Sequence, residues 1–486
     1  MRKRFEAQLT LGSIPIEQIQ IPLKSRDALP SLVRALQYIY TNKDISEQVF
    51  SLLEACICTK LATGRPGMDL WAIFVLASVR LCLNTDYDYL HHVANYDSLV
   101  RQMLGVHDGI FRGRDFELQN IKDNVRLLDD DTLRKINCLI VQAGHSLVKK
   151  KETEALHIKV DSFVTEANVH FPTDYNLLWD SGRKCIAVLE QLMEVDRAYC
   201  TGWRKIDNWL KRLKKNMLNL SRATADRSSK GKKRIEKAVH EYLLVARGLS
   251  CKLYNVQPIN PSDIVESMMF KQLNYFHQML DKHIFLVDRR LIKGEIIPHE
   301  EKIFSIFEPW VEWICKGKKH KPVELGKLTC IASDQWHFIL DWWIADHQTD
   351  NQMLLPLIDR IRNIYRMLSS CSGDTGFYSK IDIDIMEEFQ IKAFIPKKGK
   401  RSIADLQREN DPEFIKAKRA HSSVESNIHE LEHCGLDRCP DKGIRGMHRY
   451  VGLAVIAYNL RRMGKILLQQ DREEVRKKGT KLRRAA

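Results

Sequence analysis

LHIKVDSFVTEANVHFPTD, residues 156–174, combines the pattern of a β-strand with a carboxylate near the strand's end. Between Leu156 and Val160 apolar side chains alternate with polar ones, so one face of the strand can lie in a core. The strand displays Asp161, and the Pro-Thr-Asp turn at 172–174 indicates that an ordered loop follows. A strand-end carboxylate either binds a metal or is solvated, and the rest of the chain is needed to choose.

The chain has 486 residues, too many for one ordinary core, and we expect roughly two to four domains. A hydrophobic content of 44% with 29% charged residues is typical of a soluble globular protein. No run reaches the roughly 18 apolar residues of a membrane span, and the start, MRKRFEAQLTLGS, lacks the apolar core of a signal peptide. We therefore expect a cytoplasmic protein without membrane contacts, in which the 12 scattered cysteines are reduced.

The formal net charge of +15 indicates a polyanionic partner, and nucleic acid is the favoured one. A strong local excess lies at 201–250, where there are 14 Lys and Arg but only 4 Asp and Glu. Around Trp203 and Trp209 apolar residues are interleaved with cations, so one side of a helix can pack while the other faces phosphates. The alternative is a solvated charged helix. The candidate DNA-binding residues of this region are Lys211, Arg212, Lys214, Lys215, Lys232 and Lys233.

The periodicity of apolar residues divides the chain into segments of different character. Residues 1–150 predict a helical N-terminal domain that suits DNA binding, with helices at 29–40, 45–61, 70–83, 87–104, 115–128 and 130–148. Asp69 can cap the very apolar third helix. The remaining segments are a first strand-containing part at 151–176, a basic helical segment at 177–325, a second strand-containing part at 326–466 and a basic flexible tail at 467–486.

Strand signals return after residue 325. LTCIASD (328–334) and WHFILDWWI (336–344) predict an antiparallel pair with a tight turn, and a helix capped near residue 350 follows. Asp374 then lies between two glycines in SGDTG, which lets the backbone approach a neighbour closely. Beyond it, Glu425 lies in the first turns of a helix that a serine pair can cap, and a very apolar helix at 450–460 closes the folded region.

Three carboxylates thus arrive from separate elements: Asp161, Asp374 and Glu425. Such carboxylates can converge on two divalent metal ions, which activate a water molecule and stabilise the leaving oxygen in phosphodiester cleavage. Oxygen-only ligands favour Mg²⁺ or Mn²⁺ over zinc. The acids that compete for these places are Glu166 and Asp174 in the first block and Glu430 and Glu432 in the last.

Four blocks carry a resemblance to a known family. They are GRPGMDLWAIFVLASVRLCLNTDYDYLHHV (64–93), VDSFVTEANVHFPTDYNLLWDSGR (160–183), SGDTGFYS (372–379), and HSSVESNIHELEHCGLDRCPDKG (421–443) with RYVGLAVIAYNLRRMG (449–464). Together they resemble the DDE transposases of bacterial insertion sequences, and their amino-acid sequences are similar to those of the ISNCY-type group. The resemblance covers most of the chain.

The resemblance implies an α+β multidomain protein: a helical N-terminal domain, then an RNase H-like α/β catalytic domain that the basic helical segment interrupts. It implies a transposase that binds the terminal inverted repeats of its element, cuts at the ends with metal-activated water and joins the freed 3′-hydroxyl to target DNA. Asp161, Asp374 and Glu425 would be catalytic and bind two Mg²⁺ or Mn²⁺ ions. The partners would be double-stranded DNA and further copies of the chain, as a homodimer or higher oligomer associated with the bacterial nucleoid.

The chain also departs from the pattern of this family. Many relatives place Tyr and Arg shortly before the catalytic Glu, where this chain has His421 and two serines, and its nearest arginine, Arg419, is the candidate DNA contact. A structure-selective nuclease on the same fold and a non-catalytic DNA-binding protein of transposase descent remain the alternatives.

A group of possible zinc ligands follows Glu425, namely His429, His433, Cys434, Cys439 and His448. Their spacing fits no standard zinc finger, and a helix that starts near Glu425 would place His433 and Cys434 on different faces. We therefore expect core or DNA-contacting roles for them.

Overall fold

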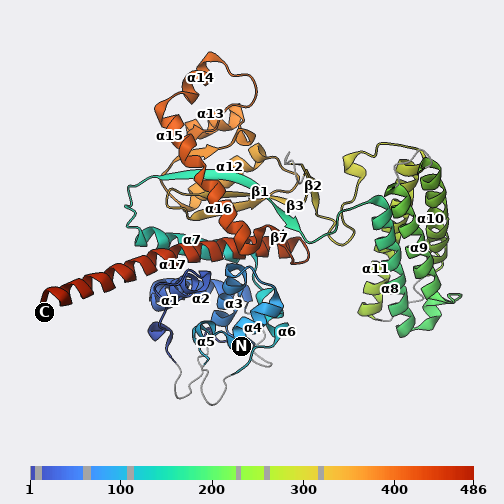
Figure 1. Cartoon of the computed structure of the whole chain (residues 1–486), viewed down its shortest axis with the longest axis horizontal. Coiled ribbons are helices and arrows are strands. Elements are labelled where there is room, and N and C mark those ends of the chain that lie inside the picture. The colour runs from blue at the N-terminus through green and yellow to red at the C-terminus, as the bar shows by residue number, and fades with distance from the viewer. Residues whose placement is uncertain are drawn as a thin grey trace. The chain divides into compact units, whose positions relative to one another are not determined.

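The computed structural model describes residues 2–5, 14–57, 67–106, 114–225, 231–256, 263–315 and 322–485, and of 479–485 only the backbone (Figure 1). The chain divides into two compact units. The first unit comprises Met1–Asn168 and Ile314–Ala486, and the second, which we call the helical unit, comprises Val169–Trp313.

The N-terminal part of the first unit is helical. Its helices are η1 (Ile16–Gln18), α1 (Ala28–Thr41), α2 (Lys43–Ile57), α3 (Leu70–Cys82), α4 (Tyr87–Tyr96), α5 (Ser98–Met103), α6 (Leu118–Val125) and α7 (Asp130–Leu147). The cap predicted for α3 is confirmed, because Asp69 accepts a hydrogen bond from the backbone N–H of Ala72 at 2.7 Å. The prediction of a single helix at 87–104 is wrong, because two helices, α4 and α5, cover this range. Asp97 ends α4 with an extended backbone and caps α5 through the N–H of Val100, so the chain turns there.

The sheet of the first unit is mixed. Its strands are β1 (Leu156–Ala167), β3 (Glu324–Ser333), β4 (Ile339–Ile344), β5 (Leu368–Gly373), β6 (Lys392–Phe394) and β7 (Arg438–Cys439), while β2 (Glu312–Ile314) lies at the boundary of the two units. β1 is central: it pairs antiparallel with β3 and parallel with β5, and β6 continues the parallel side. β3 and β4 form the predicted antiparallel pair, which is confirmed.

Because β1 has neighbours on both edges, it is more buried than the sequence pattern suggested. Leu156 and Val160 lie in the core as expected, but Lys159 on the opposite face is only 9% exposed. The alternation correctly located the strand, but the covering of its second face depends on segments far away in the chain.

The C-terminal part of the first unit is again mostly helical. Its elements are α12 (Asp350–Ile364), η5 (Thr375–Phe377), α13 (Lys380–Glu388), α14 (Ile403–Glu409), α15 (Pro412–His421), α16 (Ser423–Leu431), η6 (Glu432–Leu436) and α17 (Ile444–Ala485). α17 packs on α1, α3 and α7, and Figure 1 shows it running between α1–α3 and the sheet. Residues 467–486 were expected to form a flexible tail, but α17 continues as far as Ala485 and buries Leu467 and Leu468.

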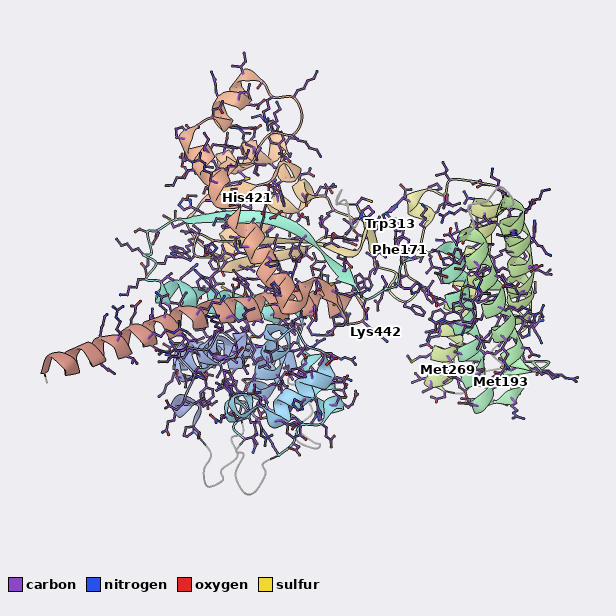
Figure 2. All side chains as sticks on the ribbon, viewed as in Figure 1. Phe171, Met193, Met269, Trp313, His421 and Lys442 are labelled. Atoms are coloured by element: carbon purple, nitrogen blue, oxygen red, sulfur yellow. The ribbon has the colours of Figure 1, made fainter. Side chains whose placement is uncertain are left out.

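The helical unit is a bundle of long helices with its own core (Figure 1). Its elements are α8 (Asp174–Val195), η2 (Arg197–Cys200), α9 (Ile206–Ala225), α10 (Gly231–Leu253), α11 (Ile264–Val287), η3 (Asp288–Ile292) and η4 (His299–Glu301). Leu213, Tyr242 and Leu280 are fully buried in the core, and Met193 and Met269 pack against it at one end of the bundle (Figure 2). Within the described ranges, no single helix is long and apolar enough to cross a membrane; only α3 and α4 taken together have that length and composition, and they bend by 119°.

Candidate active site

The register of the central strands brings two of the predicted carboxylates together. β1 and β5 run parallel, and Val160 is the partner of Gly373. The next residues along the two strands are Asp161 and Asp374. Asp161 lies in the middle of β1, paired with Ile331 of β3, whereas Asp374 directly follows the end of β5. Because neighbouring strands lie about 4.8 Å apart, the register sets these two acids beside each other.

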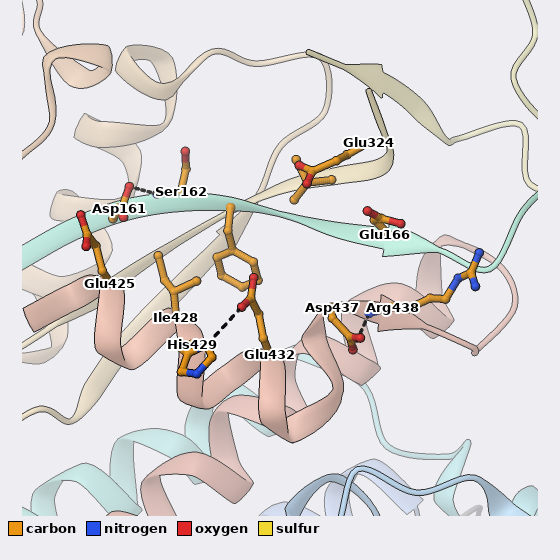
Figure 3. A pocket seen from close by; sticks show the side chains of 12 residues that line it. Asp161, Ser162, Glu166, Glu324, Glu425, Ile428, His429, Glu432, Asp437 and Arg438 are labelled. Carbon is orange, nitrogen blue, oxygen red and sulfur yellow. Dashed lines mark hydrogen bonds and ion pairs between the residues drawn. The ribbon is translucent and has the colours of Figure 1, made fainter. Parts of the chain in front are cut away.

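The third carboxylate comes from α16. Glu425 and Asp161 line the same cavity, which has a volume of about 590 Å³ (Figure 3). Figure 3 shows the two side chains at the same end of that cavity. Among the residues that the structure describes, the oxygens of Asp161, Asp374 and Glu425 do not all lie within 4.8 Å of one another.

A buried lysine connects β1 to the start of α16. The Lys159 ammonium donates a hydrogen bond to the Ser423 hydroxyl at 2.7 Å, and burial lowers the pKa of this lysine. Asp161 lies two residues after Lys159, on the same face of β1, and Glu425 lies two residues after Ser423. The Lys159–Ser423 contact therefore holds the helix that carries Glu425 against the strand that carries Asp161.

A buried histidine lies beside Asp374. His421 is 8% exposed; its Nδ1 is 3.2 Å from the Ser372 hydroxyl and its Nε2 is 3.4 Å from Asp374 Oδ1. Ser372 belongs to β5 and His421 ends α15, so these contacts attach α15 to the strand that precedes Asp374. The Asp374 side chain itself is 67% exposed and open to a ligand.

Asp350, in the first turn of α12, lies between the segments that carry Asp161 and Asp374, a role that the sequence analysis did not predict beyond a possible helix cap. Its Oδ1 accepts a hydrogen bond from the Ser162 hydroxyl at 2.7 Å. An ideal Cβ on Gly376 would lie 2.6 Å from the other oxygen, Oδ2. Asp350 therefore contacts both the residue after Asp161 and the loop after Asp374. The glycine that the motif needs for close approach is Gly376, since a Cβ on Gly373 would meet nothing nearer than 3.5 Å.

The cavity is acidic, although the chain is basic. Its charged lining residues are Asp161, Glu166, Glu324, Glu425, Glu432, Asp437 and Arg438. So many carboxylates repel one another, and cations lower the free energy of such a site. Glu324 and Asp437 were not among the residues that the sequence predicted for the site. Glu324 is far in the chain from the other acids of the cavity, whereas Asp437 lies only five residues after Glu432.

The acids that were alternatives to Asp161 and Glu425 in the sequence lie in different parts of the structure. Glu166 and Glu432 line the cavity. Glu430 instead lies 3.4 Å from the ammonium of Lys465. Asp174 belongs to the helical unit, where it forms an ion pair with Arg290 at 2.7 Å.

The cations predicted to bind DNA are exposed. Lys211, Arg212, Lys214 and Lys215 lie on α9, Lys232 and Lys233 lie at the start of α10, and Arg419 lies on α15 of the first unit. Leu213, between the α9 cations, is fully buried, so α9 packs on one face and presents charge on the other.

The possible zinc ligands do not form one group. Cys434 is buried and contacts the Arg461 guanidinium, and burial raises the pKa of Cys439 to about 12. His448 lies 3.8 Å from Asp130. The other two histidines, His429 and His433, approach each other with their Nε2 atoms 3.1 Å apart.

Comparison with known proteins gives one match. Residues 280–460 match the family model described as transposase DDE domain. This region contains Asp374 and Glu425, whereas Asp161 lies before it. No curated protein and no solved structure matches the chain. The match confirms the resemblance seen in the sequence motifs: the chain carries a region similar to the transposase DDE domain, consistent with a DDE transposase of an insertion sequence.

Proposed function

We propose that the protein is a transposase that binds the terminal inverted repeats of its own element and catalyses metal-dependent DNA strand cleavage and strand transfer. The observation that carries the proposal is the β1–β5 register, which sets Asp161 beside Asp374, with Glu425 on the wall of the cavity that Asp161 lines. The family match, which includes two of these three acids, supports the same reaction class.

An RNase H-like catalytic domain is part of this proposal. The central strand β1 has the antiparallel pair β3–β4 on one side and the parallel strands β5 and β6 on the other. The helical unit follows β1 in the chain, and β3 follows the helical unit. This order supports a catalytic domain interrupted by an insertion.

The donor set fits a hard divalent cation, because all three candidate ligands are carboxylates and two of them, Asp374 and Glu425, are exposed to water. Asp161, Asp374 and Glu425 would hold two Mg²⁺ or Mn²⁺ ions, which supply an activated water nucleophile and charge stabilisation for the leaving oxygen. The protein's own residues position this set. Lys159 holds α16 near β1, and His421 lies against Asp374.

Double-stranded DNA is the proposed partner, and a homodimer or higher oligomer is the proposed form on DNA. The net charge of +15 and the exposed cations of α9, α10 and α15 support binding to the phosphate backbone. The acidic cavity has the opposite sign, so DNA binding and chemistry are assigned to different surfaces.

The test is to incubate the purified chain with Mg²⁺ and a duplex that carries the flanking ends of its own element. We expect a footprint over the ends and a nick that leaves a free 3′-hydroxyl, with joined products when target DNA is added. A footprint without cleavage in Mg²⁺ or Mn²⁺ would identify a non-catalytic DNA-binding protein instead. Cleavage that follows DNA structure and ignores the end sequence would identify a nuclease.

A further inference from the structure

Two exposed histidines face each other one turn apart on the helical segment that carries Glu425. His429 lies on α16 and His433 on η6, which continues from it without a break. Their Nε2 atoms are 3.1 Å apart and their ring centroids 4.4 Å apart. Glu432, on the same turn, has Oε2 3.7 Å from the other ring nitrogen of His429 (Figure 3).

The separation of the two nitrogens suits shared coordination of one metal ion. Zinc–imidazole bonds are about 2.0–2.1 Å long, so two such bonds that span 3.1 Å enclose an angle of roughly 100° at the metal. This angle is close to tetrahedral. The distance between the two nitrogens therefore fits one shared ion, and the exposure of both side chains leaves the remaining coordination positions to water.

The chemistry of this pair differs from that of the carboxylate set. Imidazole nitrogen prefers borderline metals such as Zn²⁺ and Cu²⁺, whereas Mg²⁺ prefers oxygen. The nearby thiols do not join the pair, because Cys434 and Cys439 are buried within the protein.

We propose that His429 and His433 form a binding site for one borderline divalent cation of the Zn²⁺ class. Glu432 adds a negative charge beside the site, and His429 places it at the edge of the cavity that Asp161 and Glu425 line. The site is separate in its ligands and in its metal preference from the proposed catalytic carboxylates. Without a metal, the same pair can share only one N–H hydrogen bond, and two protonated rings at this distance would repel each other.

The test is calorimetric titration of the full chain with Zn²⁺ in the presence of excess Mg²⁺. We compare the wild type with His429→Gln, His433→Gln and a matched control, His240→Gln, which changes an exposed histidine on α10. Loss of either imidazole of the pair should lower the Zn²⁺ affinity of this site at least about tenfold, because the two histidines no longer chelate the ion together. The control should bind as the wild type does. Equal Zn²⁺ affinity and stoichiometry in all four proteins would overturn the proposal.

A second measurement identifies the ligands directly. Electron paramagnetic resonance of a Cu²⁺–iminodiacetate complex added to the wild type should show two coordinated imidazole nitrogens, and each single variant should lose this signature. A wild-type spectrum that shows at most one coordinated imidazole nitrogen would contradict the proposed site. Neither measurement depends on DNA cleavage, so the outcome is independent of the proposed transposase activity. Because both side chains are exposed, the substitutions should leave the fold intact, as circular dichroism would verify.

Discussion

The two glycines that flank Asp374 should respond differently to the same substitution. An ideal Cβ on Gly376 would lie 2.6 Å from Asp350 Oδ2, about 0.8 Å inside the 3.4 Å at which ordinary contact begins. Asp is a short side chain, so its carboxylate can yield this space only by rotating away from the Ser162 hydroxyl. On Gly373 the nearest atoms would be 3.5 Å from the new Cβ, which is ordinary contact.

The magnitude follows from the contact that Gly376→Ala breaks. A hydrogen bond to a charged group contributes roughly 1.5–3 kcal/mol, so the free energy of unfolding should fall by about 2 kcal/mol. Gly373→Ala should be neutral or stabilise by up to about 1 kcal/mol, because alanine restricts the unfolded chain. In Asp350→Ala the obstacle is gone, and Gly376→Ala should then cost almost nothing, so the two substitutions are strongly non-additive.

The assay is urea unfolding of the four single and double variants, together with DNA strand cleavage. Gly376→Ala should shift the unfolding midpoint downward and reduce cleavage, since Asp350 connects the residue after Asp161 to the loop after Asp374. Equal effects of Gly373→Ala and Gly376→Ala would refute the reasoning. Additive effects of Gly376→Ala and Asp350→Ala would refute it as well.

Three further predictions concern the rest of the chain. Four exposed cations of α9 are Lys211, Arg212, Lys214 and Lys215. Neutralising them together should weaken DNA binding and reduce the slope of log affinity against log salt concentration by up to about 3.6. An unchanged slope in a filter-binding titration would show that α9 is a solvated spacer. The Asp180 carboxylate, with Oδ2 3.1 Å from the Nε2 atom of His170, raises the pKa of this histidine, so the stabilisation from the pair is present below about pH 6.5 and disappears as pH rises through the raised pKa. His170→Gln should flatten that dependence in urea titrations at pH 5–8, and an unaltered pH profile would contradict it. Gly464→Ala would place a Cβ 1.7 Å from the backbone oxygen of Ser31 and should destabilise by at least about 1–3 kcal/mol, whereas a wild-type melting temperature would show that α1 and α17 can separate freely.

Local signals in the sequence were enough to predict many of the elements. The Asp69 cap and the strongly apolar α3 are readable from adjacent residues, as is the β3–β4 pair. The position of Asp374 directly after β5 could also be predicted, since it follows a short β-like run. The prediction that Asp161 lies near a strand end is wrong, because β1 continues to Ala167 and Asp161 is paired with Ile331 of β3 in the middle of the strand.

Packing between segments that are distant in the chain could not be predicted from the sequence. The burial of Lys159 requires both β3 and β5 as neighbours, and β3 begins more than 150 residues after the strand ends. The Ser162–Asp350 contact likewise joins residues 188 positions apart. The close contact between His429 and His433 could not be predicted, because the sequence showed them only as members of a larger group of possible ligands. Burial separates the cysteines of that group from the histidines, and burial depends on tertiary structure.

The carboxylate assignment is the central claim, and a comparison of neighbouring glutamates tests it most directly. Glu425→Gln keeps the shape of the side chain but removes a charged ligand, as Asp161→Asn and Asp374→Asn do. The matched control is Glu430→Gln, five residues further on, which changes a glutamate that lies near Lys465 and is not part of the cavity lining.

The measurement is the rate of Mg²⁺-dependent strand cleavage on the element's own ends, with end binding followed by footprinting on the same samples. We predict that Glu425→Gln abolishes cleavage and retains the footprint, and that Glu430→Gln cuts at close to the wild-type rate. A Glu425→Gln protein that still cuts DNA at the wild-type rate would contradict the assignment of Glu425 to the catalytic site.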